Sequence, residues 1–173
     1  MRALVLGTLL LSFVECGYHY GVLLDGSEEV SGEGVALQSR QNLIYRVAAR
    51  GVNHCCDVRV DIINLGSGPL SLTPGAATLT SGTCKPDLHL PVYVEGAGVG
   101  SLAELDAQAW ERLSSSWQWL EMRGPDQQFS IAPRAFIQLS YYAAPFRKEC
   151  APYSFSLKAG GDIVISATFI PPG

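Results

Sequence analysis

The clearest structural signal in the sequence is the alternating stretch Asp57-Val58-Arg59-Val60-Asp61-Ile62. An extended chain points successive side chains to opposite faces, so the three apolar residues share one face and the three charged residues share the other. The stretch therefore predicts a β-strand with one buried face and one polar face. The turn-forming residues Asn64-Leu65-Gly66-Ser67-Gly68-Pro69 follow it and predict the end of the strand.

Other short runs on both sides of this stretch also read as strands. They lie at 43–48, 70–72 and 87–95, and two similar copies begin at Phe129 and Phe155. Each copy reads as strand, turn, strand, so we expect two β-hairpins near the C-terminus. Many short strands at close spacing predict a mainly β fold, an antiparallel β-sandwich that is immunoglobulin-like or jelly-roll-like.

One segment has helical periodicity. Ser101-Leu102-Ala103-Glu104 has the form of a capping box, in which each end satisfies a free backbone N–H. Leu102, Leu105, Ala109 and Leu113 then recur at three- and four-residue spacing and form one apolar stripe. We expect one α-helix inserted among the strands.

The N-terminus has the pattern of a secretory signal. Met1 and Arg2 precede an apolar run from Ala3 to Val14, which is shorter than the roughly 20 residues that span a bilayer. We expect cleavage after Cys16; the alternative is a buried N-terminal strand or helix. Residues 17–34 are acidic and rich in Gly and Ser, which predicts a solvated lead-in, and residues 35–173 then form a single domain.

Removal of residues 1–16 leaves Cys55, Cys56, Cys84 and Cys150, an even number in a chain bound for an oxidising compartment. Adjacent cysteines rarely bond to each other because the ring that results is strained. The expected pairings are therefore Cys55–Cys84 with Cys56–Cys150, or Cys55–Cys150 with Cys56–Cys84. Either gives two disulfides. The cysteines and histidines lack the spacings of a zinc site, so we expect no metal.

The composition restricts the classes of partner. The chain has 173 residues, a net charge of −4 and only 16% charged residues, against about 25% in an average soluble domain. This excludes a basic nucleic-acid binder. A weakly charged surface is instead expected of a domain that docks against another protein or sits in an extracellular layer.

The sequence contains no strong catalytic motif. It has no Gly-x-Ser-x-Gly elbow, and Gly96-Ala97-Gly98-Val99-Gly100 lacks the lysine of a phosphate-binding loop. We expect no cofactor and favour a non-enzyme. The alternative is a small secreted hydrolase, or a copper enzyme if processing exposed His19 as the N-terminus. We expect His54 and His89 to be ordinary surface residues.

Aromatic residues give the strongest hint of a binding site. Trp110, Trp117 and Trp119 fall close together, and Trp117 and Trp119 share one face if that segment is extended. One residue of the pair Tyr141-Tyr142 must point outward from an alternating strand. We expect Trp117, Trp119 and Tyr142 to bind a ligand; the alternative is that the tryptophans fill the core beneath the helix.

The turn at 64–70 and the ending Phe169-Ile170-Pro171 resemble the strand edges of immunoglobulin-like domains, over a small part of the chain. Together these patterns predict a secreted, non-catalytic binding module for an extracellular protein or carbohydrate. A membrane- or lipid-interacting protein, such as a pore-former, is the main alternative. The acidic Ser27-Glu28-Glu29 stretch counts against it, because anionic lipid surfaces attract basic faces.

Overall fold

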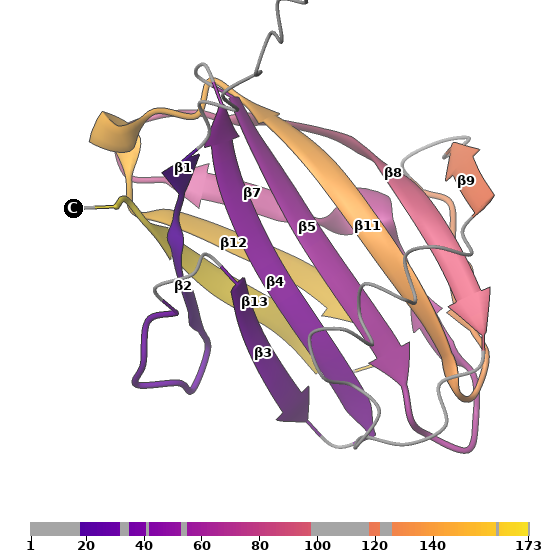
Figure 1. The fold of residues 1–173 in the computed structure, drawn as a ribbon. Coiled ribbons are helices and arrows are strands. Elements are labelled where there is room, and N and C mark those ends of the chain that lie inside the picture. The colour runs from indigo at the N-terminus through magenta and orange to yellow at the C-terminus, as the bar shows by residue number, and fades with distance from the viewer. Residues whose placement is uncertain are drawn as a thin grey trace, which may run out of the picture.

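The computed structural model describes residues 18–31, 35–40, 42–52, 55–97, 118–121, 126–161 and 163–172. These residues form a mainly β structure of two antiparallel sheets, sheet A and sheet B, which lie face to face (Figure 1). The expected leader at 1–16, the expected helix at 101–113, His54, Trp110 and Trp117 lie outside the described residues. The sandwich type and the inserted helix stay predictions.

Sheet A contains seven strands in the order β1-β4-β5-β11-β8-β9, with β3 also paired to β4. Its strands are β1 (Tyr18–His19), β3 (Val35–Arg40), β4 (Leu43–Val52), β5 (Cys55–Asn64), β8 (Asp87–Ala97), β9 (Gln118–Glu121) and β11 (Ala135–Ala144). The long strands β4, β5 and β11 lie in front in Figure 1.

Sheet B contains six strands in the order β10-β6-β12-β13-β2, with β7 also paired to β12. Its strands are β2 (Gly21–Leu24), β6 (Leu70–Leu72), β7 (Thr78–Ser81), β10 (Phe129–Ile131), β12 (Tyr153–Ala159) and β13 (Ile163–Ile170). Two short 3₁₀ turns, η1 (Pro74–Ala76) and η3 (Lys148–Cys150), complete the described elements.

The core lies between the two sheets and confirms the alternation of β5. Val58, Val60 and Ile62 are fully buried in the same cluster as the inward residues of sheet B. An aromatic group fills one end of this core, where the rings of Phe146 and Tyr153 stack with centroids 3.8 Å apart. Burial of such rings supplies a large part of the hydrophobic stabilisation of a domain.

Of the two expected hairpins, one is confirmed and one is wrong. β12 and β13 pair directly around Gly160 and Gly161. β10 pairs instead with β6 in sheet B, whereas β11 pairs with β5 and β8 in sheet A. The turn between them contains Pro133 and Arg134, and Arg134 has a φ of 61°. Here the chain crosses from one sheet to the other instead of folding back on itself.

The expected lead-in is wrong for Tyr18–Leu24, which belongs to the two sheets. β1 pairs with β4 and β2 pairs with β13, so this segment crosses from sheet A to sheet B. Tyr20, Val22 and Leu24 are buried. The physical reason is that Tyr18, Tyr20, Val22 and Leu24 alternate with more exposed residues and therefore present one apolar face.

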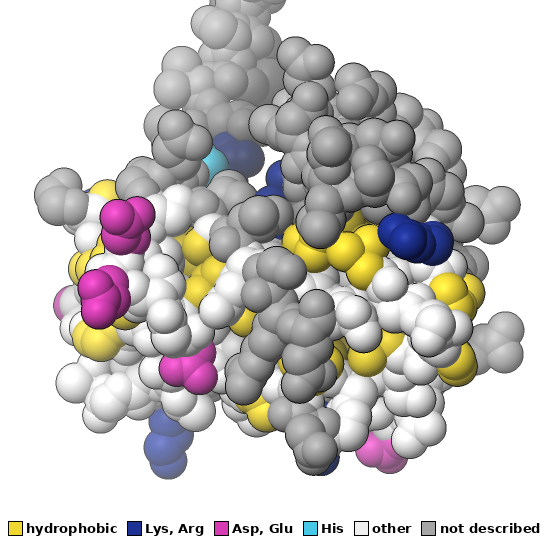
Figure 2. Space-filling view, turned by 90° about the horizontal axis from the view of Figure 1, so that it is seen from below, with side chains coloured by type: hydrophobic (Ala, Val, Ile, Leu, Met, Phe, Trp, Pro, Cys, Tyr) yellow, Lys and Arg dark blue, Asp and Glu magenta, His cyan; other side chains and the backbone are white. Residues whose placement is uncertain are grey.

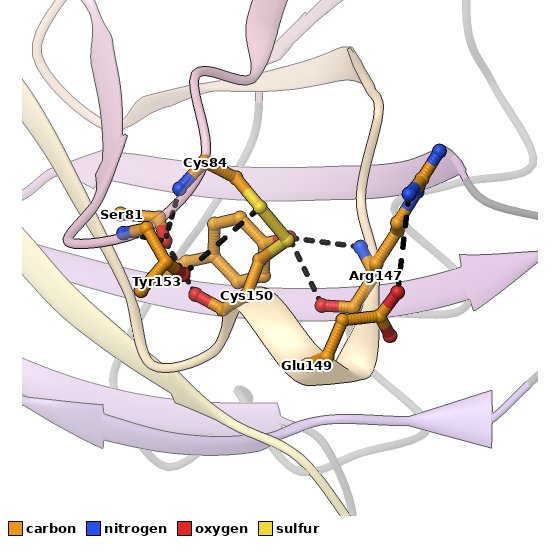
Figure 3. Close-up of a disulfide and its surroundings, with 7 residues drawn as sticks. Ser81, Cys84, Arg147, Glu149, Cys150 and Tyr153 are labelled. Carbon is orange, nitrogen blue, oxygen red and sulfur yellow. Dashed lines mark hydrogen bonds and ion pairs between the residues drawn. A yellow bond between two sulfur atoms is a disulfide. The ribbon is translucent and has the colours of Figure 1, made fainter.

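The expected disulfide pairings are also wrong, because Cys84 bonds to Cys150 (Figure 3). Cys84 follows β7 and Cys150 ends η3 just before β12, and Ser81 of β7 lies opposite Tyr153 of β12. The strand pairing thus brings the two cysteines together, with their Cα atoms 5.6 Å apart. Cys56 is buried in the core, where its thiol donates to the Asp57 carbonyl at 3.5 Å.

Ser81 of β7 connects the backbone at this disulfide to sheet B through hydrogen bonds. Its hydroxyl donates to the Cys150 carbonyl oxygen and accepts a hydrogen bond from the Cys84 amide at 3.4 Å. On the other side of the bridge, the Tyr153 hydroxyl donates to the Arg147 carbonyl at 3.0 Å and accepts from the Arg147 amide at 2.8 Å. The disulfide therefore lies in a hydrogen-bonded corner of the fold (Figure 3).

Candidate binding surface on sheet A

The outer face of sheet A is the polar side that the alternation of β5 predicts. Cross-strand pairing aligns Arg50 of β4 with Asp57 of β5, Asp57 with Tyr142 of β11, and Tyr142 with His89 of β8. Residues directly opposite each other in an antiparallel sheet point to the same face. Four polar residues from four strands therefore form one row across this face.

Tyr142 is the exposed aromatic residue of β11 in this row. Its side chain is 46% exposed, whereas Tyr141 is buried and its hydroxyl donates to the Pro74 carbonyl at 2.9 Å. This confirms that one residue of the pair points outward. The exposed His89 ring lies beside Tyr142 with ring centroids 5.6 Å apart, and its exposure is also as predicted.

The β8 strand is irregular next to these rings. Ser140 lies opposite Val92 and Tyr142 opposite His89, so β8 holds one extra residue between the two pairs. Pro91 lies in this interval, and proline has no N–H with which to continue a ladder. Such bulges re-aim nearby side chains and are frequent beside binding sites. Pro91 within a strand pattern is the sequence signal for this irregularity.

A buried carboxylate lies one row further along the same face. Asp61 is only 2% exposed although it belongs to the polar side of β5. Arg46 contacts its Oδ2 through Nε at 2.7 Å and through Nη2 at 2.6 Å. Arg59 donates from Nε to Oδ1 at 3.1 Å, and the Gln138 amide also donates to Oδ1.

These contacts compensate for the burial of the Asp61 side chain. Removal of a carboxylate from water is costly unless charged donors replace its hydration. Two guanidinium groups and one amide do so here. In return Asp61 fixes the direction of Arg59, whose side chain is 37% exposed and which lies directly opposite Ser140 of β11. Arg59 and Tyr142 therefore occupy diagonal positions on the neighbouring strands β5 and β11.

The structure places only some of the expected site residues. Tyr142 is at the surface. The backbone of Trp119 in β9 lies opposite Val94, which lies opposite Gln138, so it continues the row of Asp61. The side chain of Trp119 lies outside the described part of the chain, as does all of Trp117. Sequence reasoning missed Arg59, Asp61 and Asp57, although the alternation of β5 had placed them together on one polar face.

Hollows elsewhere on the described surface offer less specific chemistry. One of about 400 Å³ lies over sheet B, and its lining includes Ser154, Ser166, Thr168 and Asp25. Within the described residues no group of three or more His, Cys, Asp or Glu side chains is arranged to hold a metal ion. No helix in the described part of the chain is long and apolar enough to cross a bilayer.

Among the described side chains visible in Figure 2, few are charged, the acidic groups lie apart from one another, and a histidine is seen beside basic side chains in the upper half of the view. This agrees with the low content of charged residues in the sequence. Comparison with protein-family models, with curated proteins and with solved structures found no match for this chain.

Proposed function

We propose that this chain is a secreted, non-catalytic binding module of the immunoglobulin-like sandwich type that binds an extracellular glycan on the outer face of sheet A. One observation carries the proposal: the exposed Tyr142 ring lies beside His89 in a row of polar side chains on rigid strands. The leader pattern of residues 1–16 and the Cys84–Cys150 disulfide support secretion.

A glycan suits this surface because each sugar ring has an apolar face and a hydroxylated edge. The apolar face stacks on an aromatic ring such as Tyr142. The hydroxyl groups need both donors and acceptors nearby. Asp57 supplies acceptors and Arg59 supplies donors from the neighbouring strand β5, and Ser140 on β11 itself supplies both. Strands hold such groups more rigidly than loops do.

The test is retention of the secreted protein on a panel of immobilised extracellular polysaccharides, neutral and acidic. We expect Tyr142→Ala to weaken binding at least about tenfold, equal to about 1.4 kcal/mol. Val164→Ala is the matched control, because Val164 is 37% exposed on the outer face of sheet B, and we expect it to bind as wild type. Retention on no polysaccharide, or equal retention of Tyr142→Ala, would contradict the proposal.

Secretion has its own test. We expect the exported protein to begin at Gly17, which mass spectrometry of the intact protein measures directly. A product that retains residues 1–16, or that stays in the reducing interior of the producing cell, would contradict this part of the proposal.

A further inference from the structure

We infer that a hollow on the outer face of sheet B is a second binding site, which holds one uncharged sugar unit through its hydroxyl groups. The hollow has a volume of about 490 Å³ and is lined mainly by polar and small side chains. Pockets that bind small molecules have volumes of about 300–1,000 Å³. The site is separate from the face proposed to bind a glycan, because the outer faces of the two sheets lie on opposite sides of the fold.

The register of three neighbouring strands places the polar residues of this hollow side by side. Leu72 of β6 pairs with β10 on one side and with Ala159 of β12 on the other. The residues one position further along these strands are Gln128, Thr73 and Lys158, so they form the next row across the sheet. Leu72 and Ala159 are buried, and the next row therefore points to the outer face.

Small residues leave space beside this row. Gly160 donates its N–H to the Ser71 carbonyl at 2.7 Å, which joins the turn between β12 and β13 to β6. A Cβ added at Gly161 would meet nothing within 4 Å. Ala76 of η1 is the other small residue of the lining. The space beside the polar row is therefore open to a ligand.

The polar groups of the lining are also available. Within the described part of the chain, four of its side chains have no hydrogen-bond or ion-pair partner: Ser71, Thr73, Gln128 and Lys158. The two hydroxyls and the amide group both donate and accept hydrogen bonds, whereas the ammonium group only donates. Each hydroxyl of a sugar likewise both donates and accepts. The lining can therefore satisfy several hydroxyls of one sugar unit.

Other classes of ligand suit this lining less well. Its described residues include no aromatic or large apolar side chain for a lipid and no carboxylate for a metal ion. An anion is not favoured either. Asp126 lies two residues before Gln128 in the sequence and Asp162 directly follows Gly161, so acidic residues adjoin two segments of the lining. A neutral ligand with many hydroxyls needs no excess of positive charge.

The experiment follows the backbone amide signals of the isotope-labelled secreted chain by NMR during titration with a sugar. The probes are methyl glucoside, methyl galactoside and N-acetylglucosamine, and sodium acetate is the reference anion. We expect at least one sugar to shift the signals of Ser71, Thr73, Lys158 and Gly161 until they saturate. Since a single sugar unit has few atoms, we expect a Kd of about 1 mM or weaker.

Two variants and one control assign these shifts to the hollow. Lys158→Met removes the ammonium group and keeps the apolar stem, and we expect it to weaken sugar binding at least about fivefold through the lost charge-assisted hydrogen bond. The double variant Ser71→Ala with Thr73→Val removes both hydroxyls and should also weaken binding. Lys85→Met is the matched control, because Lys85 is exposed in the loop after β7 and does not line the hollow. We expect it to bind as wild type. Thermal unfolding checks each variant, and the double variant decides the matter if Lys158→Met does not fold.

The outcomes separate this site from the one on sheet A. Shifts at the hollow that persist in Tyr142→Ala and are weakened in Lys158→Met support the second site, whether or not sheet A binds a glycan. Shifts confined to Tyr142 and His89 leave the proposed function intact and overturn the second site, as does the absence of any shift. Larger shifts at Lys158 with acetate than with every sugar, or an equal loss in Lys85→Met, overturn the assignment of a sugar to the hollow.

Discussion

The Asp61 cluster gives the sharpest prediction for stability. In Asp61→Asn the shape of the side chain is kept and its negative charge is lost. Arg46, whose side chain is only 18% exposed, then remains largely out of water without the carboxylate that contacts it at 2.6 Å. We expect this variant to be much less stable than wild type.

The magnitude follows from the burial of the partners. Removal of one member of a fully buried ion pair costs about 3–5 kcal/mol, because the other charge is left poorly solvated. Arg46 and Arg59 are 18% and 37% exposed, so water relieves part of this cost. We therefore expect the free energy of unfolding to fall by about 2–4 kcal/mol.

Urea unfolding at neutral pH, followed by circular dichroism, measures this change by linear extrapolation. The denaturant slope should stay the same, because the surface exposed on unfolding is unchanged. Asp57→Asn is the matched control: Asp57 lies on the same face of β5 but is exposed. We expect the free energy of unfolding of this control to lie within about 0.5 kcal/mol of the wild-type value.

One result would refute the reasoning. The free energy of unfolding of Asp61→Asn could lie within about 1 kcal/mol of the wild-type value. In that case the attraction of Asp61 for its arginines only cancels the cost of its burial. A second variant separates these terms. We expect the joint replacement Arg46→Met with Asp61→Leu to cost less than Asp61→Asn alone, because it leaves no buried charge behind.

Three further predictions concern other parts of the fold. Burial raises the pKa of the Tyr141 phenol above its usual 10.0, so the stability from this neutral group is complete below about pH 10 and lost at higher pH. Between about pH 10 and pH 12 the free energy of unfolding of wild type should fall more steeply than that of Tyr141→Phe, by about 1.4 kcal/mol per pH unit; equal slopes would contradict this. Replacement of Cys84 and Cys150 by Ala, which opens a bridge spanning 66 residues, should lower the free energy of urea unfolding by about 4 kcal/mol, and a loss below about 1 kcal/mol would show that the bridge is not formed. Gly160→Ala should lower the stability by about 1–2 kcal/mol in thermal unfolding, because the φ of Gly160 is +71°. Gly161→Ala, whose new Cβ would meet nothing within 4 Å, should be near neutral, and equal losses in the two variants would contradict the backbone argument.

Features set by nearest neighbours along the chain could be predicted from the sequence. The alternation of β5 placed Val58, Val60 and Ile62 in the core, and the pair Tyr141-Tyr142 had to present one ring outward. Both conclusions need only the two-residue period of a strand. The same period in Tyr18–Leu24 predicts β1 and β2, whereas the acidic residues that follow favour a solvated segment.

Features set by strand pairing could not be predicted in this way. Cys84 meets Cys150 because β7 pairs with β12, and no local spacing encodes that pairing. The burial of Asp61 likewise depends on Arg46, 15 residues away, and Gln138, 77 residues away. Each of these residues looks like an ordinary polar surface residue in its own strand. Only the register of β4, β5 and β11 brings them together into one cluster.

The two faces of β5 therefore differ in what they contribute. Apolar residues alone would stabilise the core side, and a buried ion pair is seldom better for stability than apolar residues of similar size. The Asp61 cluster is then best explained by the arginine that it positions. On the proposed function, the variant Arg46→Met with Asp61→Leu should stay folded yet bind the polysaccharide that retains the wild type at least about tenfold more weakly. Unchanged affinity for that polysaccharide in this folded variant would show that Asp61 serves the fold alone.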